Sequence, residues 1–282
     1  MNRVVFQGIN GAYSQEAIHQ YFGEEIETIP CPSFRDLFIS VEADQADYAI
    51  LPVENAVAGS VNQSYELLAE HDLSIYAEII LRVRHTLMTL PESDPQEIHT
   101  VRSHPQALSQ CQNYLRRHGY NAVAHFDTAG SARDLAQSPE SGVAVIASVF
   151  AAQLYGLKVI DQGIEDFSFN FTRFFLLSYL KPPRAEKNKT SIVFATPHAP
   201  GVLYNCLGEF ARRNINLTKI ESRPRLNKPW QYLFYLDFEG HAQDIETEAA
   251  LMGILRQASF VKLLGSYQAA ETIMDGQNGN LP

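Results

Sequence analysis

Residues 166–180 read DFSFNFTRFFLLSYL, a run of aromatic and aliphatic residues with three polar residues in its middle. These are Asn170, Thr172 and Arg173. If the segment is an extended strand, Asn170 and Thr172 face one side and Arg173 faces the other, because side chains alternate along a strand. An arginine among phenylalanines needs an acidic partner or an anionic ligand, since burying an unpaired charge is costly. The stretch therefore predicts a strand that carries either a structural Arg–Glu pair or part of a binding site.

The chain has 282 residues, enough for one large domain or two ordinary ones. Its formal net charge is −10 and its pI is about 5.4, which argues against nucleic acid or an anionic membrane as a main partner, because both require a basic surface. We expect a small soluble ligand instead. No apolar run approaches about 18 residues and no signal-peptide core precedes the strand-like segment 4–6, so we expect a cytoplasmic protein.

The three cysteines, Cys31, Cys111 and Cys206, are far apart and have no spacing typical of a metal or redox site. We expect them to be buried thiols. The sequence has no nucleotide-binding loop, no Gly-x-Ser-x-Gly elbow and no set of residues at metal-ligand spacing. It therefore predicts chemistry without a cofactor or a metal.

Short β-branched or aromatic runs alternate with amphipathic stretches from Val4 to about Leu180, a pattern typical of an α/β protein with largely parallel strands. The expected strands are 3–7, 48–53, 74–81, 98–102, 122–125, 143–147, 157–160 and 172–179. The expected helices lie near 14–22, 34–43, 61–71, 105–118, 129–137 and 147–155.

A charged segment with two prolines, 181–189, has no apolar period and is a candidate linker. After it the pattern predicts strand, helix, two strands, helix and strand, which is the βαββαβ order of a ferredoxin-like module. The expected strands are 190–196, 216–222, 230–238 and 261–267, and the expected helices follow Pro200-Gly201 and lie near 243–258. The Gly- and Asn-rich end of the chain is expected to be disordered.

Five polar clusters interrupt the first domain, and four of them fall where a strand ends or a helix begins. They are Gly8–Ser14, Pro52–Ser60, Ser103–Ala107, Asp127–Ala132 and the opening stretch. In open α/β sheets, ligands bind at that edge. Taken alone, each of the first four clusters is also explained by an ordinary turn or a capped helix start, and the opening stretch by a structural Arg–Glu pair. Together, several helix N-termini and one buried arginine suit a ligand with more than one carboxylate.

Seven motifs in this order resemble the prephenate dehydratases and the closely similar arogenate dehydratases. The motifs are GINGAYS (8–14), PVENAVAG (52–59), SHPQA (103–107), DTAGSA (127–132), NFTRF (170–174), PGVLYN (200–205) and ESRP (221–224). The resemblance covers nearly the whole chain, from about Val4 to Tyr267. It implies loss of the ring hydroxyl and a carboxylate from prephenate, giving phenylpyruvate, water and carbon dioxide.

The resemblance also implies a domain organisation. A catalytic domain, 1–181, has two α/β lobes similar to those of periplasmic solute-binding proteins. Lobe one spans about 1–80 plus 168–181, and lobe two spans about 81–167. A linker (182–188), a ferredoxin-like ACT regulatory domain (189–269) and a disordered tail (270–282) follow.

The resemblance implies a role for individual residues in each of these motifs. Thr172 is expected to hydrogen-bond or help protonate the leaving hydroxyl, Arg173 to pair with a substrate carboxylate, and Phe174 to exclude water. The remaining residues expected to act in catalysis or to hold the substrate are Glu54, Asn55, Ser14, Ser103, His104, Asn170, Thr128 and Ala129.

Three positions depart from the pattern associated with bacterial members. Asn10 stands where an acid is frequent, and Ala56 and Asp127 each stand where a serine is frequent. A carboxylate at a helix start repels an anionic substrate unless it acts purely as a cap, so the choice between prephenate and arogenate stays open. Arogenate carries an ammonium in place of the side-chain keto group, which one carboxylate could recognise.

The resemblance to ACT domains implies that phenylalanine binds between two such domains of a homodimer or homotetramer. The residues expected at that site are Gly201, Val202, Leu203, Asn205, Glu221, Ser222, Arg223 and Pro224. Two alternatives remain. A two-lobed protein of this kind could be a sensor that binds a solute or amino acid without catalysis, which the Thr172-Arg173 motif disfavours. A fusion to chorismate mutase is not expected, because no helical domain precedes the first motif.

Overall fold

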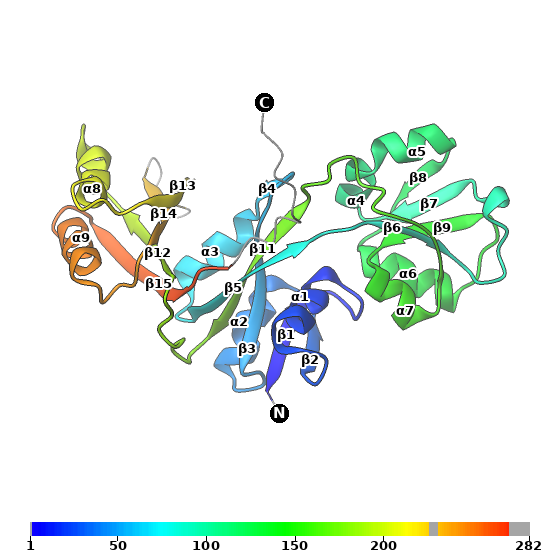
Figure 1. Ribbon diagram of the computed structural model, residues 1–282, viewed down its shortest axis with the longest axis horizontal. Helices are drawn as coiled ribbons and strands as arrows, with labels where there is room; N and C mark the ends of the chain where they lie inside the picture. The colour runs from blue at the N-terminus through cyan, green and yellow to red at the C-terminus, as the bar shows by residue number, and fades with distance from the viewer. Residues whose placement is uncertain (1, 226–230, 271–282) are drawn as a thin grey trace. The chain divides into compact units, whose positions relative to one another are not determined.

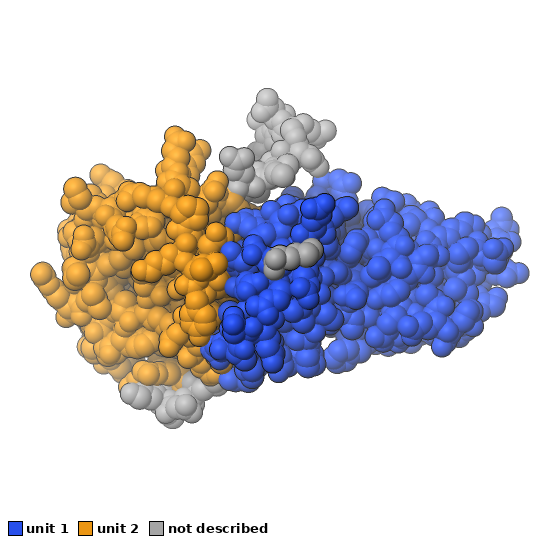
Figure 2. All heavy atoms as spheres, turned by 90° about the horizontal axis from the view of Figure 1, so that it is seen from below, with its two compact units in different colours: residues 1–67, 81–176 blue, residues 68–80, 177–282 orange. Residues whose placement is uncertain are grey.

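The computed structural model describes residues 2–225 and 231–270. The chain forms two compact units, residues 1–67 with 81–176 and residues 68–80 with 177–282 (Figure 2). The expected disordered tail lies outside the described residues from position 271 onward. Three β-sheets organise the chain (Figure 1).

The first sheet has the order β2-β1-β3-β11-β5, and the short β4 pairs with β3. β1 runs parallel to both β2 and β3. Its strands are β1 (Arg3–Gln7), β2 (Glu27–Cys31), β3 (Tyr48–Asn55), β4 (Gly59–Ser60), β5 (Ser74–Arg82) and β11 (Phe171–Ser178). The helices that connect the early strands are α1 (Tyr13–Phe22), α2 (Phe34–Glu42) and α3 (Asn62–Glu70). The continuous burial of β1 and β3 explains their apolar sequences, since both faces of a parallel sheet are covered.

The second sheet has the order β10-β6-β9-β7-β8. β7 is parallel to β8 and β9, whereas β6 is antiparallel to β9 and β10. Its strands are β6 (Thr86–Thr89), β7 (Thr100–Ser103), β8 (Asn121–Ala124), β9 (Val143–Ala147) and β10 (Lys158–Gln162). The helical segments are a 3₁₀ turn (Pro95–Glu97), α4 (Pro105–Gln110), α5 (Gln112–His118), α6 (Thr128–Gln137) and α7 (Val149–Tyr155).

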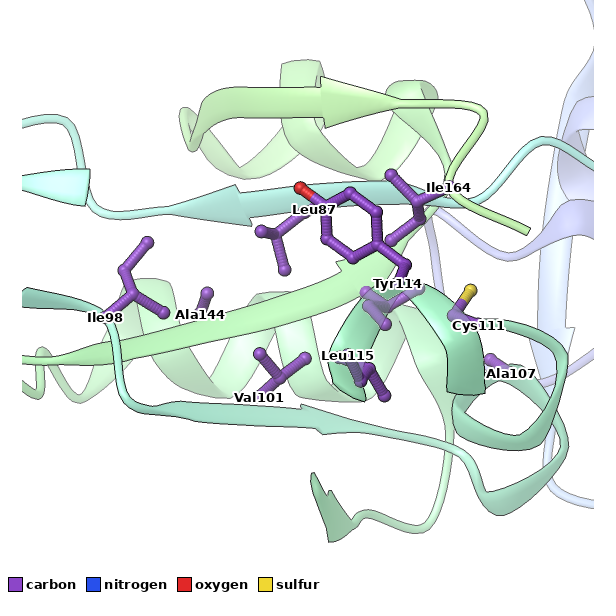
Figure 3. Close-up of a cluster of buried hydrophobic side chains, with 10 residues drawn as sticks. Leu87, Ile98, Val101, Ala107, Cys111, Tyr114, Leu115, Ala144 and Ile164 are labelled. Carbon is purple, nitrogen blue, oxygen red and sulfur yellow. The ribbon is translucent and has the colours of Figure 1, made fainter. Parts of the chain in front are cut away.

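Helices cover both faces of the second sheet. Leu87 and Ala144 point toward α4 and α5, and Figure 3 shows them with Val101, Tyr114 and other members of that cluster. The neighbouring Met88 and the β9 residues Val143, Val145 and Ala147 point toward α6 and α7 instead. This alternation puts one apolar cluster on each face.

Two connecting segments link the first two sheets, the first at residues 83–85 and the second at residues 163–170, and they are hydrogen-bonded to each other. Val83 N–H donates to the Asn170 carbonyl at 2.8 Å, and Gly163 N–H donates to the His85 carbonyl at 2.9 Å. His85 N–H donates to Glu165 Oε2 at 2.9 Å. The two segments are therefore held together where they pass between the first two sheets.

The third sheet is antiparallel with the order β13-β14-β12-β15. Its elements follow the βαββαβ order: β12 (Asn188–Ala195), α8 (Val202–Ala211), β13 (Leu217–Pro224), β14 (Tyr232–Glu239), α9 (Ile245–Leu255) and β15 (Phe260–Gln268). Both helices pack on one face of this sheet (Figure 1). Phe194, Phe210 and Phe238 are fully buried there. The expected α/β class and the ferredoxin-like order are confirmed.

Three local expectations were wrong. The pattern misses β2 because Pro30 interrupts it, and β2 tolerates the proline as an edge strand. It also misses β6, a four-residue run without its own turn signals. The helix expected at 105–118 is two helices, because the Gln110 carbonyl accepts from Asp166 N–H at 2.7 Å and the Asp166 carboxylate accepts from Asn113 N–H at 3.2 Å.

Candidate functional site

A pocket in the first unit has a volume of about 430 Å³, a size typical of small-molecule sites. The carboxyl ends of β1 and β3, the starts of α1, α4 and α6, and one side of β11 contribute its wall. Its polar lining consists of Gln7, Tyr13, Ser14, Asn55, His85, His104, Gln106, Gln110, Asp127, Thr128 and Thr172. Among these described residues Asp127 is the one carboxylate, and the lining contains no lysine or arginine. An anionic ligand would therefore be held by neutral donors and helix starts.

Two ten-residue helices direct their N-termini at this pocket. α1 begins at Tyr13, its N-cap Ala12 supplies no side-chain cap, and Ser14 lines the pocket. α6 begins at Thr128 and is capped by Asp127, whose Oδ1 accepts from Gly130 N–H at 2.8 Å. A helix N-terminus carries about half a positive charge, so the start of α1 favours an anion. At α6, the cap carboxylate offsets part of that charge.

The glycine that precedes α1 at position 11 is required by close packing. Gly11 has φ +94°, and a Cβ on it would lie 3.2 Å from the Ala151 Cβ. Ser148 Oγ donates to the Gly11 carbonyl at 3.0 Å, and Gly11 N–H donates to Gln15 Oε1 at 2.7 Å. The GINGAYS motif thus joins α7 to the pocket wall, a contact that only a glycine accommodates without strain.

Asn55, at the end of β3, sets the direction of the hydrogen bonds beneath the pocket. Its Oδ1 accepts from the backbone N–H groups of Val57 at 3.1 Å and Ala58 at 2.8 Å, which identifies that atom as the oxygen. Its Nδ2 therefore donates, to Asn170 Oδ1 at 2.8 Å and to Thr172 Oγ1 at 3.0 Å. Because Thr172 Oγ1 accepts this bond, its own hydrogen is available to a ligand in the pocket.

Gln110, the last residue of α4, completes a buried cluster of three amides. Its Oε1 accepts from Asn170 Nδ2 at 3.1 Å, and its Nε2 donates to Asn55 Oδ1 at 3.4 Å. All three side chains are less than a tenth exposed. We call Asn55, Gln110 and Asn170 the amide cluster; it is uncharged, and each member is hydrogen-bonded to the other two.

His85 and Tyr13 continue the hydrogen bonds of the amide cluster beyond Gln110. The His85 ring lies 2.8 Å from Tyr13 Oη through Nδ1 and 2.8 Å from Gln110 Oε1 through Nε2. Burial lowers the pKa of His85 below its usual value, although the Gln110 hydrogen bond and the Glu165 carboxylate oppose this. Burial also raises the pKa of the Tyr13 phenol well above its usual value. Both groups are therefore neutral near pH 7.

Arg173 faces away from the pocket. Its Nη1 lies 3.9 Å from Glu54 Oε2, and its guanidinium lies 4.7 Å from the centre of the Phe175 ring. Neither Arg173 nor Glu54 lines the pocket, whereas Thr172 and Phe174 do. The alternation expected for this strand is observed, and the charge lies beside a carboxylate.

The other expected site residues fall into two groups. Ser14, His104 and Thr128 line the pocket. Ser103 and Ala129 are fully buried outside its lining, and Ser103 Oγ donates to the Ile146 carbonyl at 2.6 Å.

Sequence reasoning did not assign Tyr13, His85 or Gln110 to the site, and it treated Asp127 as a helix cap and as a departure that leaves the substrate open, without assigning it to the site. One feature of the sequence could have indicated Gln110. It is a polar residue on the buried stripe of its helix, seven residues after Ser103. His85 follows an apolar strand directly, but its role depends on three segments that are remote in sequence.

The second unit has a pocket of about 270 Å³ at the start of α8. Gly201 and Leu203 line it together with Tyr204, Tyr232 and Phe234. Gly201 has φ +80°, the left-handed conformation that favours glycine. The other residues expected at the effector site, which are Val202, Asn205, Glu221, Ser222, Arg223 and Pro224, are not part of this lining.

The expected effector-site residues 221–224 lie at the end of β13, an edge strand of the third sheet. There Glu221 lies 3.1 Å from Lys219 Nζ and 2.8 Å from Arg223 Nε.

Within residues 2–225 and 231–270, no group of three or more His, Cys, Asp or Glu side chains could hold a metal ion. In the same part of the chain, no helix is long and apolar enough to span a membrane. The three cysteines are free and buried.

Comparison with known proteins gives consistent results. A family model described as prephenate dehydratase matches residues 4–182. The chloroplastic arogenate dehydratase/prephenate dehydratase 1 of Arabidopsis thaliana is 42% identical over 282 residues, covering 94% of this chain and 71% of the plant protein.

Two solved structures are also similar. The structure of a prephenate dehydratase from Arthrobacter aurescens in complex with L-Phe has a TM-score of 0.87 and 32% identity, covering 95% of this chain and 90% of the other. The structure of GqqA, described as a novel type of quorum quenching acylase, has a TM-score of 0.88 and 32% identity, covering 95% of this chain and 98% of the other.

Proposed function

The chain belongs to the prephenate dehydratase family, and from this premise we propose that it converts prephenate to phenylpyruvate in phenylalanine biosynthesis, without a cofactor. The reaction takes place in the pocket of the first unit. The carbon–carbon bond to the ring carboxylate breaks, its electrons complete the aromatic ring, and the carbon–oxygen bond to the ring hydroxyl breaks. Carbon dioxide leaves, and the hydroxyl takes up one proton to leave as water.

The observation that carries this proposal is the hydrogen bond from Asn55 Nδ2 to Thr172 Oγ1. It occupies the oxygen of Thr172 and directs its hydroxyl hydrogen to the leaving group. Threonine is too weak an acid to supply the proton by itself, so Thr172 orients and relays a proton that comes from solvent. A positioned general acid contributes about 10²–10⁴-fold, and orientation and electrostatics supply the rest.

The substrate carboxylates are held by the start of α1, where Ser14 lies, and by the polar groups around His104 and Thr128. Phe174 excludes water. Arg173 and Glu54, which lie outside the lining, are positioning residues for β11 and β3 in this proposal. The Glu54 carboxylate offsets the charge of the Arg173 guanidinium, whose side chain is 12% exposed.

Arogenate is the second candidate substrate, and Asp127 is the observation that favours it. Asp127 Oδ1 caps α6, and Asp127 is the one carboxylate among the described lining residues. A carboxylate in this position attracts the ammonium of arogenate, whereas the keto group of prephenate is uncharged and gains no such attraction. The product from arogenate is phenylalanine itself.

We further propose that residues 189–269 are an ACT domain that binds phenylalanine at the pocket beside Gly201 and regulates the catalytic unit. In this proposal the catalytic domain spans 1–181, residues 182–188 are the linker, and a homodimer or homotetramer in the cytoplasm is the working form. Three free, buried cysteines fit a reducing compartment. Phenylalanine regulates only if it binds one conformational state more tightly than another.

The test is turnover of the purified full chain on prephenate and on arogenate, following phenylpyruvate and phenylalanine, with and without added phenylalanine. Thr172→Ala is expected to lose about 10²–10⁴-fold in kcat. Thr172→Ser keeps the hydroxyl and is the matched control, expected to retain most of the activity. No turnover of either substrate, with phenylalanine still bound, would favour a sensor over an enzyme.

A further inference from the structure

His85 lies between β5 and β6 and is only 2% exposed. Its backbone is hydrogen-bonded to Gly163 and Glu165, which belong to the second connecting segment. Its ring contacts Tyr13 Oη and Gln110 Oε1, each at 2.8 Å. One residue thus connects both segments through its backbone, and the first turn of α1 and the last residue of α4 through its ring.

The amide cluster determines which atoms of His85 carry hydrogen. Gln110 Oε1 accepts from Asn170 Nδ2, so it is an oxygen, and the His85 Nε2 that faces it must be the donor. Burial lowers the pKa of His85, so the ring is neutral near pH 7 and Nδ1 is an acceptor. The Tyr13 hydroxyl then donates to Nδ1, although the Arg84 carbonyl is also 3.1 Å away.

The hydrogen bonds therefore run in one direction across the base of the pocket. Tyr13 donates to His85, and His85 donates to Gln110. Gln110 donates to Asn55 at 3.4 Å, and Asn55 donates to Thr172 at 3.0 Å. Each group in this series accepts one hydrogen bond and donates the next. The hydroxyl hydrogen of Thr172, at the end of the series, is therefore directed into the pocket.

We propose that His85 is a positioning residue for the dehydration put forward above, on which this inference rests. As the neutral Nε2–H tautomer held by Tyr13, it provides one of the two donors that hold the Gln110 oxygen. Without that donor, the Gln110 side chain is free to take other rotamers, and the support for the amide that orients Thr172 is weakened. His85 itself does not contact the reacting atoms.

The first test compares two substitutions of His85. His85→Leu fills the space but cannot donate, and it is expected to lower kcat about 10- to 100-fold while KM changes less than about threefold. His85→Gln can place an amide N–H near the position of Nε2 and is expected to recover most of the loss. Equal losses in two folded variants would overturn the proposal.

The second test asks whether His85 acts through Gln110. If it does, His85→Leu combined with Gln110→Leu loses no more activity than Gln110→Leu alone, because both remove the same support. Additive losses would contradict this route. Thr89→Val is the matched control: it removes a buried hydrogen bond to the Val143 carbonyl in the second sheet, outside the pocket, and should leave kcat unchanged.

A third measurement does not depend on turnover. Nitrogen-15 NMR of the histidine rings at pH 7, with His85→Leu used to assign the signal, is expected to show a neutral Nε2–H tautomer. A charged ring or an Nδ1–H tautomer would overturn the proposal even in an active enzyme. The expected tautomer in a protein that converts neither substrate would instead reject the proposed function, and with it the role assigned to His85.

Discussion

The base of the pocket and the start of the third sheet stabilise their buried polar groups in different ways. The base of the pocket is the uncharged amide cluster, with Tyr13 and His85 on its far side. In the second unit, Lys189 Nζ lies 2.9 Å from both carboxylate oxygens of Glu78, and the Glu78 side chain is fully buried. Neutral amides define a hydrogen-bond direction without placing a charge beside an anionic substrate. An ion pair has no such direction, but it is costly to break, so it suits a structural contact.

This comparison predicts that the two regions fail in different ways, and the largest effect is expected in the second unit. Lys189→Met removes the Lys189 ammonium from the buried Glu78 carboxylate, although Ala270 N–H still donates to it at 3.1 Å. We expect the free energy of unfolding of that unit to fall by about 3–5 kcal/mol. Urea denaturation of the full chain measures this.

The double variant Glu78→Gln/Lys189→Met provides the control, since it removes both charges and should recover much of the stability. In both variants kcat, measured well below the unfolding transition, should stay near that of the wild type. If either variant lost kcat without losing stability, the Glu78–Lys189 pair would not be purely structural, and the two regions would not differ in this way.

The next largest effect is expected from Asn55→Asp, which preserves shape and both acceptor bonds from Val57 and Ala58 but removes the donor to Thr172. Misdirection of the Thr172 hydroxyl should lower kcat about 100-fold. The new carboxylate oxygen also faces Asn170 Oδ1 and the Phe171 carbonyl, so the unfolding midpoint should fall too, and kcat is measured well below the unfolding transition. Asn216→Asp is a matched substitution at an exposed position of the second unit, where Nδ2 donates to Glu239, and it should not affect kcat. Full turnover by Asn55→Asp would show that hydrogen-bond direction at the base of the pocket is unimportant.

A smaller effect is expected from Asp127→Asn. Asparagine retains the cap on Gly130 N–H but removes the charge from the pocket lining. The ratio of kcat/KM for arogenate to that for prephenate should fall about tenfold, corresponding to about 1.4 kcal/mol. An unchanged ratio would mean that Asp127 is only a helix cap.

The smallest effect concerns the thiols, which are neutral side chains buried in both units. Burial raises the pKa of Cys31 to about 11 and raises the pKa of Cys111 further. At pH 8 both remain thiols, so iodoacetamide should label the native protein far more slowly than the urea-unfolded chain. Rapid labelling of Cys111 in the native state would indicate that the packing around α4 opens frequently.

The alternation of NFTRF shows how much of the site is readable from local pattern. Period-two alternation places Thr172 and Phe174 on one side of β11 and Arg173 on the other, and the structure has this arrangement. The motif resemblance assigned Arg173 to a substrate carboxylate, whereas the structure places it beside Glu54. Which acid faces a buried arginine depends on the neighbouring strand, and no local pattern encodes that neighbour.

The order of elements, the alternation of faces and the helix starts follow from the sequence, because backbone propensity and side-chain period act over a few residues. The amide cluster does not, since Asn55, Gln110 and Asn170 are separated by 55 and 60 positions. Their hydrogen bonds exist only after three segments pack together. Burial then requires every donor to find an acceptor, and this requirement sets the orientation of each amide and the tautomer of His85.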